Sequence, residues 1–224
     1  PFTELYLEVL EPAGQTGGYG FFVEICMNSV EPINKSACNG PVSIGSNFPA
    51  TAQATKVLNG VEVTRKATGV TLYPSFSSDH CGSSITYPAN LPLLEGSKEL
   101  SYEFKKPIYS AEIFLYAFGD KNNEGTYDEV EFLVDGGGQL SLVKTYECNP
   151  KVANITGSIL KSVTKKTVTD VAVKVTSTKP FTKITLKDKA STGLGYSVAL
   201  CPASIYALTA SNNCTPATIC LLYT

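Results

Sequence analysis

LSYEFKKPIYSAEIFLYAF, residues 100–118, is the stretch that decides the fold class of this chain. It holds two short runs rich in β-branched and aromatic residues, 100–104 and 111–118, on either side of Pro107. Two similar runs follow at 127–134 (YDEVEFLV) and 140–146 (LSLVKTY), after turn-forming residues that include three consecutive glycines, 136–138. Short strands separated by turns are typical of antiparallel sheets. The sequence therefore predicts an all-β protein built as an antiparallel β-sandwich.

The same pattern extends in both directions from this stretch. The dipeptide Asn59-Gly60 lies between apolar residues and predicts a tight hairpin over residues 55–64. Further strands are expected at 69–73, 168–176, 181–187 and 195–201, while 74–92 is expected to be loop. Additional strands are expected near the termini, at 4–10, 19–26 and 217–223. We expect a jelly-roll-like core sandwich over residues 93–203, with 1–92 contributing strands and long loops packed on it and 204–224 a terminal strand or tail.

The composition favours a secreted or assembled protein. The chain has 224 residues, of which 43% are hydrophobic and only 17% charged, with 18 Gly and 13 Pro. In a typical soluble domain, about a quarter of all residues are charged. The sequence contains no apolar run that approaches the roughly 20 residues needed to span a bilayer as a helix. We therefore expect an extracellular, cell-surface or virion location and no membrane span.

The charges are distributed unevenly along the chain. Residues 95–135 hold ten acids and four lysines, whereas residues 151–189 hold nine lysines and only two acids. Such a pattern is typical of solvated strand faces, and it also suits a basic surface that meets an acidic one on a neighbouring copy. The basic segment lacks interleaved aromatic residues and the whole chain has a net charge of -2, so we expect no nucleic-acid partner.

Seven cysteines are many for a protein of a reducing compartment, and they favour disulfides. No two cysteines are spaced as CxxC and the chain has one histidine, so a zinc site is not expected. The first pairs expected are Cys26–Cys38 and Cys214–Cys220, each across a short loop, although spacing alone leaves the connectivity open. The odd number leaves one thiol free or linked to another chain. Acceptor sequons for N-glycosylation occur at Asn34, Asn154 and Asn213.

One loop concentrates oxygen ligands. Asp120, Asn122, Glu124 and Asp128 lie between two predicted strands, and Ca²⁺ binds six to eight hard oxygen atoms from such flexible loops. The spacing differs from that of an EF-hand loop. The same residues are typical of a polar hairpin turn, in which Asp and Asn side chains bind their own backbone. The loop is therefore a candidate calcium site, with an ordinary turn as the alternative.

The usual catalytic residue types are nearly missing. His80 lies between Asp79 and Cys81, but neighbouring residues on an extended chain point in different directions and do not converge as a triad must. The carboxylates Asp128, Glu129 and Glu131 would suit glycoside cleavage, and they equally suit the polar face of a strand. We expect no catalytic residues and no cofactor other than Ca²⁺.

Several segments together resemble a known kind of module. Residues 100–115, 127–132, 180–186 and 195–200 follow the order aromatic–Pro–strand, Asp-Glu-Val strand, Phe-x-x-Ile strand and Gly-initiated closing strand. This order resembles jelly-roll or galactose-binding-like β-sandwich modules of bacterial surface proteins and phage virion proteins, over roughly half the chain. Such modules bind glycans, bind calcium or only build assemblies, so the resemblance alone does not choose a function. The chain has no Trp, unlike the glycan-binding members.

The sequence thus favours a non-enzymatic structural or attachment subunit of an extracellular assembly, such as a virion appendage or surface filament. Its expected partners are copies of itself or other subunits, which terminal strands would join by pairing with a neighbour's sheet edge. The alternative is a carbohydrate-binding module for cell-surface glycans, with or without calcium.

Overall fold

The structure is a computed structural model, and it describes residues 38, 48–78, 81, 85–119, 127–164, 167–189 and 195–207. Every strand in this part of the chain belongs to one compact unit, residues 34–208. The strands expected at 4–10, 19–26 and 217–223 lie outside the described residues. Within the described ranges no helix is both long and apolar enough to cross a membrane.

Almost all regular structure in the described residues is extended. The exception is one turn of 3₁₀-helix, η3 (Pro202–Ser204). The strands are β1 (Gln53–Leu58), β2 (Val61–Lys66), β3 (Thr71–Tyr73), β4 (Phe76–Ser78), β5 (Ile85–Tyr87), β6 (Leu91–Leu94), β7 (Glu99–Gly119), β8 (Glu129–Val134), β9 (Leu140–Glu147), β10 (Ala153–Thr156), β11 (Ile159–Ser162), β12 (Val168–Asp188) and β13 (Tyr196–Leu200).

The two longest strands, β7 and β12, organise the fold. Each has 21 residues, and they pair antiparallel along their whole length. The sequence predicts two separate strands on either side of Pro107, but the structure shows one strand that runs through it. The register jumps from Lys183↔Glu103 to Phe181↔Ile108, so Pro107 lies in a bulge of β7 where no ladder hydrogen bond is required of it.

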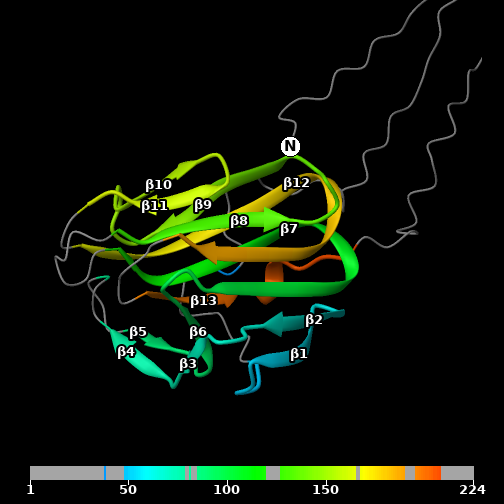
Figure 1. The fold of residues 1–224 in the computed structure, drawn as a ribbon, viewed down its shortest axis with the longest axis horizontal. Coiled ribbons are helices and arrows are strands. Elements are labelled where there is room, and N and C mark those ends of the chain that lie inside the picture. Colours follow the sequence, from blue (N-terminus) through cyan, green and yellow to red (C-terminus); the bar gives the residue numbers. More distant parts are fainter. Residues whose placement is uncertain are drawn as a thin grey trace, which may run out of the picture. The chain divides into compact units, whose positions relative to one another are not determined.

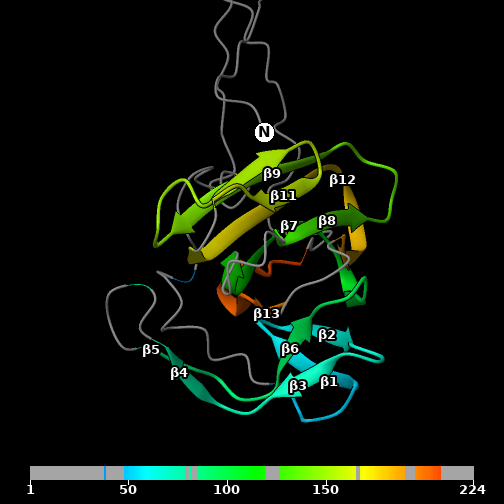
Figure 2. The same ribbon diagram turned by 60° about the vertical axis from the view of Figure 1, so that its left-hand side comes forward.

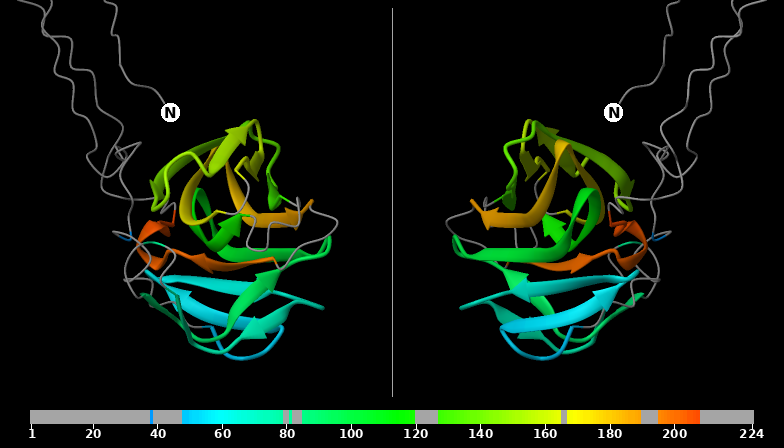
Figure 3. Two further views of the ribbon diagram at one scale, coloured as in Figure 1. Left: turned by 90° about the vertical axis from the view of Figure 1, so that its left-hand side faces the viewer. Right: turned by 90° about the vertical axis from the view of Figure 1, so that its right-hand side faces the viewer.

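A second bulge compensates the first on the partner strand. The register jumps again between Phe181 and Thr176, this time with the extra residues on β12. Bulges bend strands, and strands that bend in this way pass from one sheet layer to the other. Both long strands therefore contribute one half to each layer, as Figures 1 and 3 show.

The two layers follow from the strand pairings. One layer runs β9, the first half of β12, the second half of β7, β13, β6 and β3. The other runs β10, β11, β8, the second half of β12, the first half of β7, β2 and β1. All pairs are antiparallel, and all strands except β4 and β5 join in one 11-stranded hydrogen-bonded sheet. The prediction of an all-β antiparallel sandwich is confirmed.

Four of the six described strands before residue 95, β1, β2, β3 and β6, are part of the same sheet. Strand β2 pairs with β7 and β6 pairs with β13, so these four strands continue the two layers rather than forming a layer of their own. The hairpin predicted at Asn59-Gly60 is confirmed as the β1–β2 turn, with φ values of 48° and 77°. Positive φ at both central residues is the signature of a type I′ turn. The expected loop 74–92 contains β4 and β5, a separate two-stranded sheet (Figure 2).

The main hydrophobic core lies between the two layers. Alternate residues of each strand enter it, as the period of two requires. Its fully buried members include Val63, Leu100, Ile113, Leu115, Phe132, Val171, Val173, Ile184, Leu186 and Val198.

A second, smaller core covers the outer face of one layer. On β7, Phe114 and Tyr116 alternate with residues of the main core. They therefore point outward, where they pack with Ala172 and Ala199. They are covered by Cys38, Tyr87, Leu91 and Cys201, with Cys81 and Tyr146 at the margin. Both faces of this half of β7 are thus buried, which explains why residues 111–119 are all buried in sequence.

Arg65 is the only arginine of the chain, and it is 1% exposed. Its guanidinium donates hydrogen bonds to the backbone carbonyls of Asn90 (2.8 Å), Pro49 (3.0 Å) and Thr51 (3.0 Å). It also lies over the ring of Phe48, 5.2 Å from the centroid. Burial lowers the pKa of this guanidinium, and the neighbouring Tyr102 opposes that effect. Arg65 therefore fastens the segment around residues 49–51 and the turn at Asn90 to β2.

Candidate functional site

The layer that runs from β10 through β8 and the second half of β12 to β1 carries a row of ion pairs on its outer face. Lysine and glutamate alternate from strand to strand: Lys161–Glu129 (2.8 Å), Lys189–Glu131 (3.4 Å), Lys187–Glu99 (3.6 Å) and Lys66–Glu103 (2.7 Å). The register explains the order, because Lys187 lies opposite Glu131 on β8 and opposite Glu99 on β7. Three of these lysines come from the basic segment 151–189 and their partners from the acidic segment 95–135. The two segments therefore neutralise each other within one chain.

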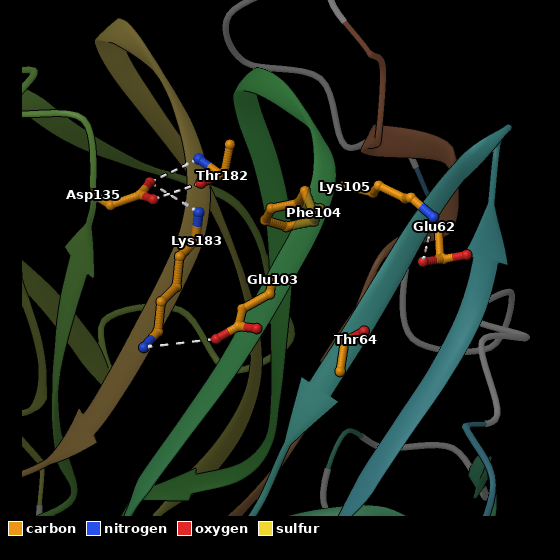
Figure 4. A pocket seen from close by; sticks show the side chains of 8 residues that line it. All are labelled: Glu62, Thr64, Glu103, Phe104, Lys105, Asp135, Thr182 and Lys183. Carbon is orange, nitrogen blue, oxygen red and sulfur yellow. Dashed lines mark hydrogen bonds and ion pairs between the residues drawn. The ribbon is translucent and has the colours of Figure 1, made fainter.

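The candidate pocket opens on the same face, where β7 and β12 bend. It is an open hollow with a volume of about 350 Å³ (Figure 4). The bulged segments supply Phe104, Lys105 and Thr182, and neighbouring positions complete the lining with Glu62, Thr64, Glu103, Asp135 and Lys183. Phe104 is only 3% exposed, so the accessible lining is mostly polar.

Four of the five charged groups that line the pocket form ion pairs, and the fifth, Asp135, is held by hydrogen bonds. Lys105 lies 3.2 Å from Glu62, and Lys183 lies 4.0 Å from Glu103, which also binds Lys66. Figure 4 shows the Lys105–Glu62 pair between β7 and β2 and, apart from it, the Lys183–Glu103 pair between β12 and β7. The lining holds three carboxylates and two ammonium groups, and Lys66 beside Glu103 supplies a third cation, so the pocket carries little net charge and presents mainly hydrogen-bonding groups.

Asp135, just after β8, is held by three hydrogen bonds. Its carboxylate accepts from the Thr182 amide (2.7 Å), the Lys183 amide (2.9 Å) and the Thr182 hydroxyl (2.6 Å). Burial by itself would raise the pKa of Asp135, but these hydrogen bonds outweigh it and hold the pKa below its ordinary value. Asp135 is therefore ionised at neutral pH and serves as a hydrogen-bond acceptor, not as an acid.

Asp135→Asn should make the unfolding free energy less dependent on pH in acid. A carboxyl whose pKa is lower in the folded state stabilises the fold above the unfolded-state pKa, about 3.9, and this stabilisation is lost as pH falls through the folded-state pKa. Urea midpoints of the wild type and the variant should therefore differ at pH 7 and converge towards pH 2. A constant difference across this range would contradict the assignment, and Glu62→Gln is the matched control in the same pocket.

A second polar group is buried beneath the outer-face core. The Asp170 carboxylate is fully buried, and it accepts hydrogen bonds from the Tyr87 hydroxyl (2.6 Å) and the Ala117 amide (2.9 Å). Ala117 has φ 56° at a bulge of β7, where its amide leaves the ladder. Asp170 thus satisfies an amide that the bulge would otherwise leave without a partner. Burial, followed by the bond to Asp170, raises the pKa of Tyr87, so its hydroxyl stays protonated and donates.

Two neighbouring tyrosines of this core should respond oppositely to removal of their hydroxyl groups. The Tyr116 hydroxyl is buried without a hydrogen-bond partner, whereas that of Tyr87 binds Asp170. Tyr116→Phe should raise the free energy of unfolding by about 1 kcal/mol, and Tyr87→Phe should lower it by about 2 kcal/mol. Denaturant unfolding followed by far-ultraviolet circular dichroism measures both. Equal effects of the two substitutions would contradict this network.

Two disulfides fasten the covering segments to the sandwich. Cys38 pairs with Cys201, 163 residues away, and Cys81 pairs with Cys148, 67 residues away. The expected Cys26–Cys38 pair is therefore wrong. The reason is topological. Cys201 follows β13 on the outer face, where its amide donates to the Glu112 carbonyl. The order of the strands in the sheet, rather than spacing in the sequence, determines that Cys38 meets it there. Cys26, Cys214 and Cys220 lie outside the described residues.

The other predicted site residues are placed only in part. Asp128 is 4% exposed and its carboxylate accepts a hydrogen bond from the Gly119 amide (2.7 Å). Asp120, Asn122 and Glu124 lie outside the described residues, as does His80, so the calcium site stays a prediction. Asn154 is exposed on β10, while Asn34 and Asn213 lie outside the described part.

In the described part of the chain, two groups of side chains lie close enough together to hold a metal ion, and each of them contains a disulfide. They are Cys38, Glu112 and Cys201, and Cys81, Cys148 and Asp170. Their sulfur atoms are covalently joined in pairs and so are not thiolate ligands.

The sheet edges differ in how they are protected. At β9, the Lys144 ammonium donates to the Ala153 carbonyl (2.5 Å) and the Glu147 carboxylate accepts from the Ala153 amide (2.8 Å). These side chains join β9 to β10 across the open side of the sandwich. Strands β3 and β10 have only three and four residues. Among the described strands, the six-residue β1 pairs with β2 alone and has no comparable cover.

Sequence reasoning missed Arg65, Asp135 and Asp170. One sequence feature could have pointed to Arg65: it is the only arginine in a chain that has 17 lysines. The partners of all three are groups distant in sequence, backbone groups for Arg65 and both backbone and side-chain groups for Asp135 and Asp170, and no local pattern displays them.

In the described part of the chain, the fold and these sites define an all-β antiparallel sandwich with a polar pocket, two disulfides that join covering segments to an outer face, and an edge strand, β1, that no other described strand covers. Comparison with protein-family models, with curated proteins and with solved structures finds no match to this chain.

Proposed function

We propose that this chain is a non-enzymatic structural or attachment subunit of an extracellular assembly, such as a virion appendage or surface filament. The observation that carries the proposal is the uncovered edge strand β1, because an edge presents backbone donors and acceptors that a strand of another chain can satisfy. Long-range disulfides support an oxidising, extracellular setting.

The surface charges fit this proposal. The row of ion pairs neutralises the acidic and basic segments within one chain, so association through that face would have to break existing pairs. Contact between subunits is therefore better supplied by backbone pairing at an edge than by opposite charges on two copies.

Sedimentation velocity of the full oxidised chain tests the proposal. We expect discrete oligomers whose share grows as the concentration rises from about 1 μM to the high micromolar range, where weak edge contacts associate. A single monomeric species at every concentration, from a protein with an intact cooperative melting transition, would argue against a self-assembling subunit.

The polar pocket favours a second candidate, a carbohydrate-binding module. Its carboxylates, ammonium groups and hydroxyls suit sugar hydroxyls, and its volume of about 350 Å³ is at the lower end for ligand sites. Glycan-array binding that is lost in Glu103→Gln but kept in Glu99→Gln would select this candidate. Loss of the same binding with EDTA would add calcium to it.

A further inference from the structure

The β1–β2 turn fixes which backbone groups of β1 face outward. In a two-residue hairpin, the residues that flank the turn, Leu58 and Val61, form a hydrogen-bonded pair, and such pairs alternate along the ladder. Ala54 and Lys56 then direct their amides and carbonyls towards β2. Gln53, Thr55 and Val57 direct theirs towards the open edge, and the side chains of these three residues are exposed.

The same edge carries the most exposed apolar side chains. Among the described large apolar residues, Val57 (63%) and Tyr206 (57%) are the most exposed. Both lie near the turn end of β1, because the Asn59 side chain donates to the Ile205 carbonyl (2.8 Å) and so holds the segment before Tyr206 against the turn. An open backbone edge and exposed apolar surface therefore coincide at one place.

We propose that β1 pairs antiparallel with β1 of a second copy of this chain, about a two-fold axis at Thr55. This inference rests on the proposed function and names its contact. Thr55 lies opposite Thr55 of the second copy, and Gln53 lies opposite Val57. In this register all three outward-facing residues exchange their amide and carbonyl hydrogen bonds with the second copy. The Gln53 carbonyl, which already accepts from the Thr51 hydroxyl (2.6 Å), retains a second lone pair for this bond.

The side chains select this register over its neighbour. Moving the axis one residue, to Lys56, places Lys56 directly opposite Lys56 of the second copy, in a pair without backbone hydrogen bonds where side chains come closest. That register also leaves Gln53 outside the ladder. With the axis at Thr55, Lys56 lies opposite the small Ala54. The interface is isologous and closes on itself, so this contact alone produces a dimer, and a larger assembly would need a second contact elsewhere on the chain.

The affinity of this contact is expected to be low. One six-residue strand and two apolar side chains bury far less than the roughly 1,200 Å² of a stable interface. Dissociation in the micromolar range or weaker follows, so the dimer should depend strongly on concentration.

Cysteine crosslinking of the full chain tests the register. In the proposed dimer the two Thr55 Cα atoms lie about 5.5 Å apart, within disulfide range. Mild oxidation of the Thr55→Cys variant should therefore give a clearly larger fraction of covalent dimer than oxidation of the wild-type chain. The native cysteines of the wild type set the background for this comparison. The matched control Lys56→Cys should give none; if it crosslinks in place of Thr55→Cys, the register is wrong.

A proline variant tests the edge itself. The Thr55 amide faces outward, so Thr55→Pro removes an edge donor and leaves the β1–β2 ladder intact. The substitution also removes the exposed hydrogen bond between the Thr55 and Thr64 hydroxyls (2.9 Å), so Thr55→Val, which loses that bond but keeps the amide, is the matched control. We expect similar melting temperatures for the two variants and a dimer dissociation constant at least about tenfold higher for Thr55→Pro. If the wild type assembles but Thr55→Pro assembles equally and Thr55→Cys does not crosslink, the β1 inference fails and the proposed function stands. If the wild type never assembles, both fail.

Discussion

Replacing Arg65 with methionine is expected to lower the free energy of unfolding by about 3 to 5 kcal/mol. The guanidinium is buried and supplies hydrogen bonds to three backbone carbonyls, those of Pro49, Thr51 and Asn90. Methionine fills a similar volume but removes all three hydrogen bonds. The Pro49 carbonyl still accepts from the Thr51 amide (2.8 Å), whereas the Thr51 and Asn90 carbonyls lose the donor that Arg65 supplies. The chain has no Trp, so urea unfolding followed by far-ultraviolet circular dichroism is the suitable measurement.

Arg65→Lys is the matched control for this prediction. Lysine keeps the charge but is a point donor on a flexible stem and does not reproduce the planar fork that reaches several carbonyls at once. We expect its free energy of unfolding to lie between those of the wild type and Arg65→Met. A loss below about 0.5 kcal/mol in Arg65→Met, the range of ordinary surface substitutions, would contradict the role given to Arg65.

Removal of the Cys38–Cys201 disulfide is the other change of large expected effect. The bond closes a loop across 163 residues, and chain-entropy arguments give about 5 kcal/mol for a loop of that length. Cys38→Ala with Cys201→Ala should therefore lower the free energy of unfolding by about 3 to 5 kcal/mol. Guanidinium unfolding under non-reducing conditions measures this loss.

The Cys81–Cys148 pair provides the comparison. It closes a shorter loop, across 67 residues, and both of its cysteines are partly exposed, so its removal should have the smaller effect. Peptide mapping of the oxidised chain must recover a fragment that joins Cys38 to Cys201. Recovery of a Cys26–Cys38 fragment in its place would overturn the pairing described here.

Local patterns sufficed for much of the fold. Asn59-Gly60 predicted the β1–β2 hairpin because a type I′ turn depends on two adjacent residues that tolerate positive φ. The alternation of Val171, Val173 and Val175 predicted a strand with one face in the core, and all three are buried there. These features depend on short-range chemistry that the sequence displays directly.

Features that depend on sheet order were not predicted. The sequence around Pro107 predicts a break between strands, yet a bulge accommodates it within β7, because a compensating bulge on β12 lets both strands bend together. The Cys38–Cys201 pair requires Cys38 to reach the end of β13, a position known only once the layers are assembled. The same holds for Arg65 and Asp170, whose partners lie on other segments: backbone carbonyls for Arg65, and the Tyr87 hydroxyl and the Ala117 amide for Asp170.

Amide hydrogen exchange, resolved residue by residue at several protein concentrations, tests the central claim most directly. The claim is that this sandwich works by contact through the β1 edge. It predicts that the outward amides of Thr55 and Val57 exchange quickly in dilute solution and become protected as the protein associates, while that of Lys56, directed towards β2, is protected throughout. Exchange at Thr55 and Val57 that stays the same across the concentrations at which oligomers form would contradict it.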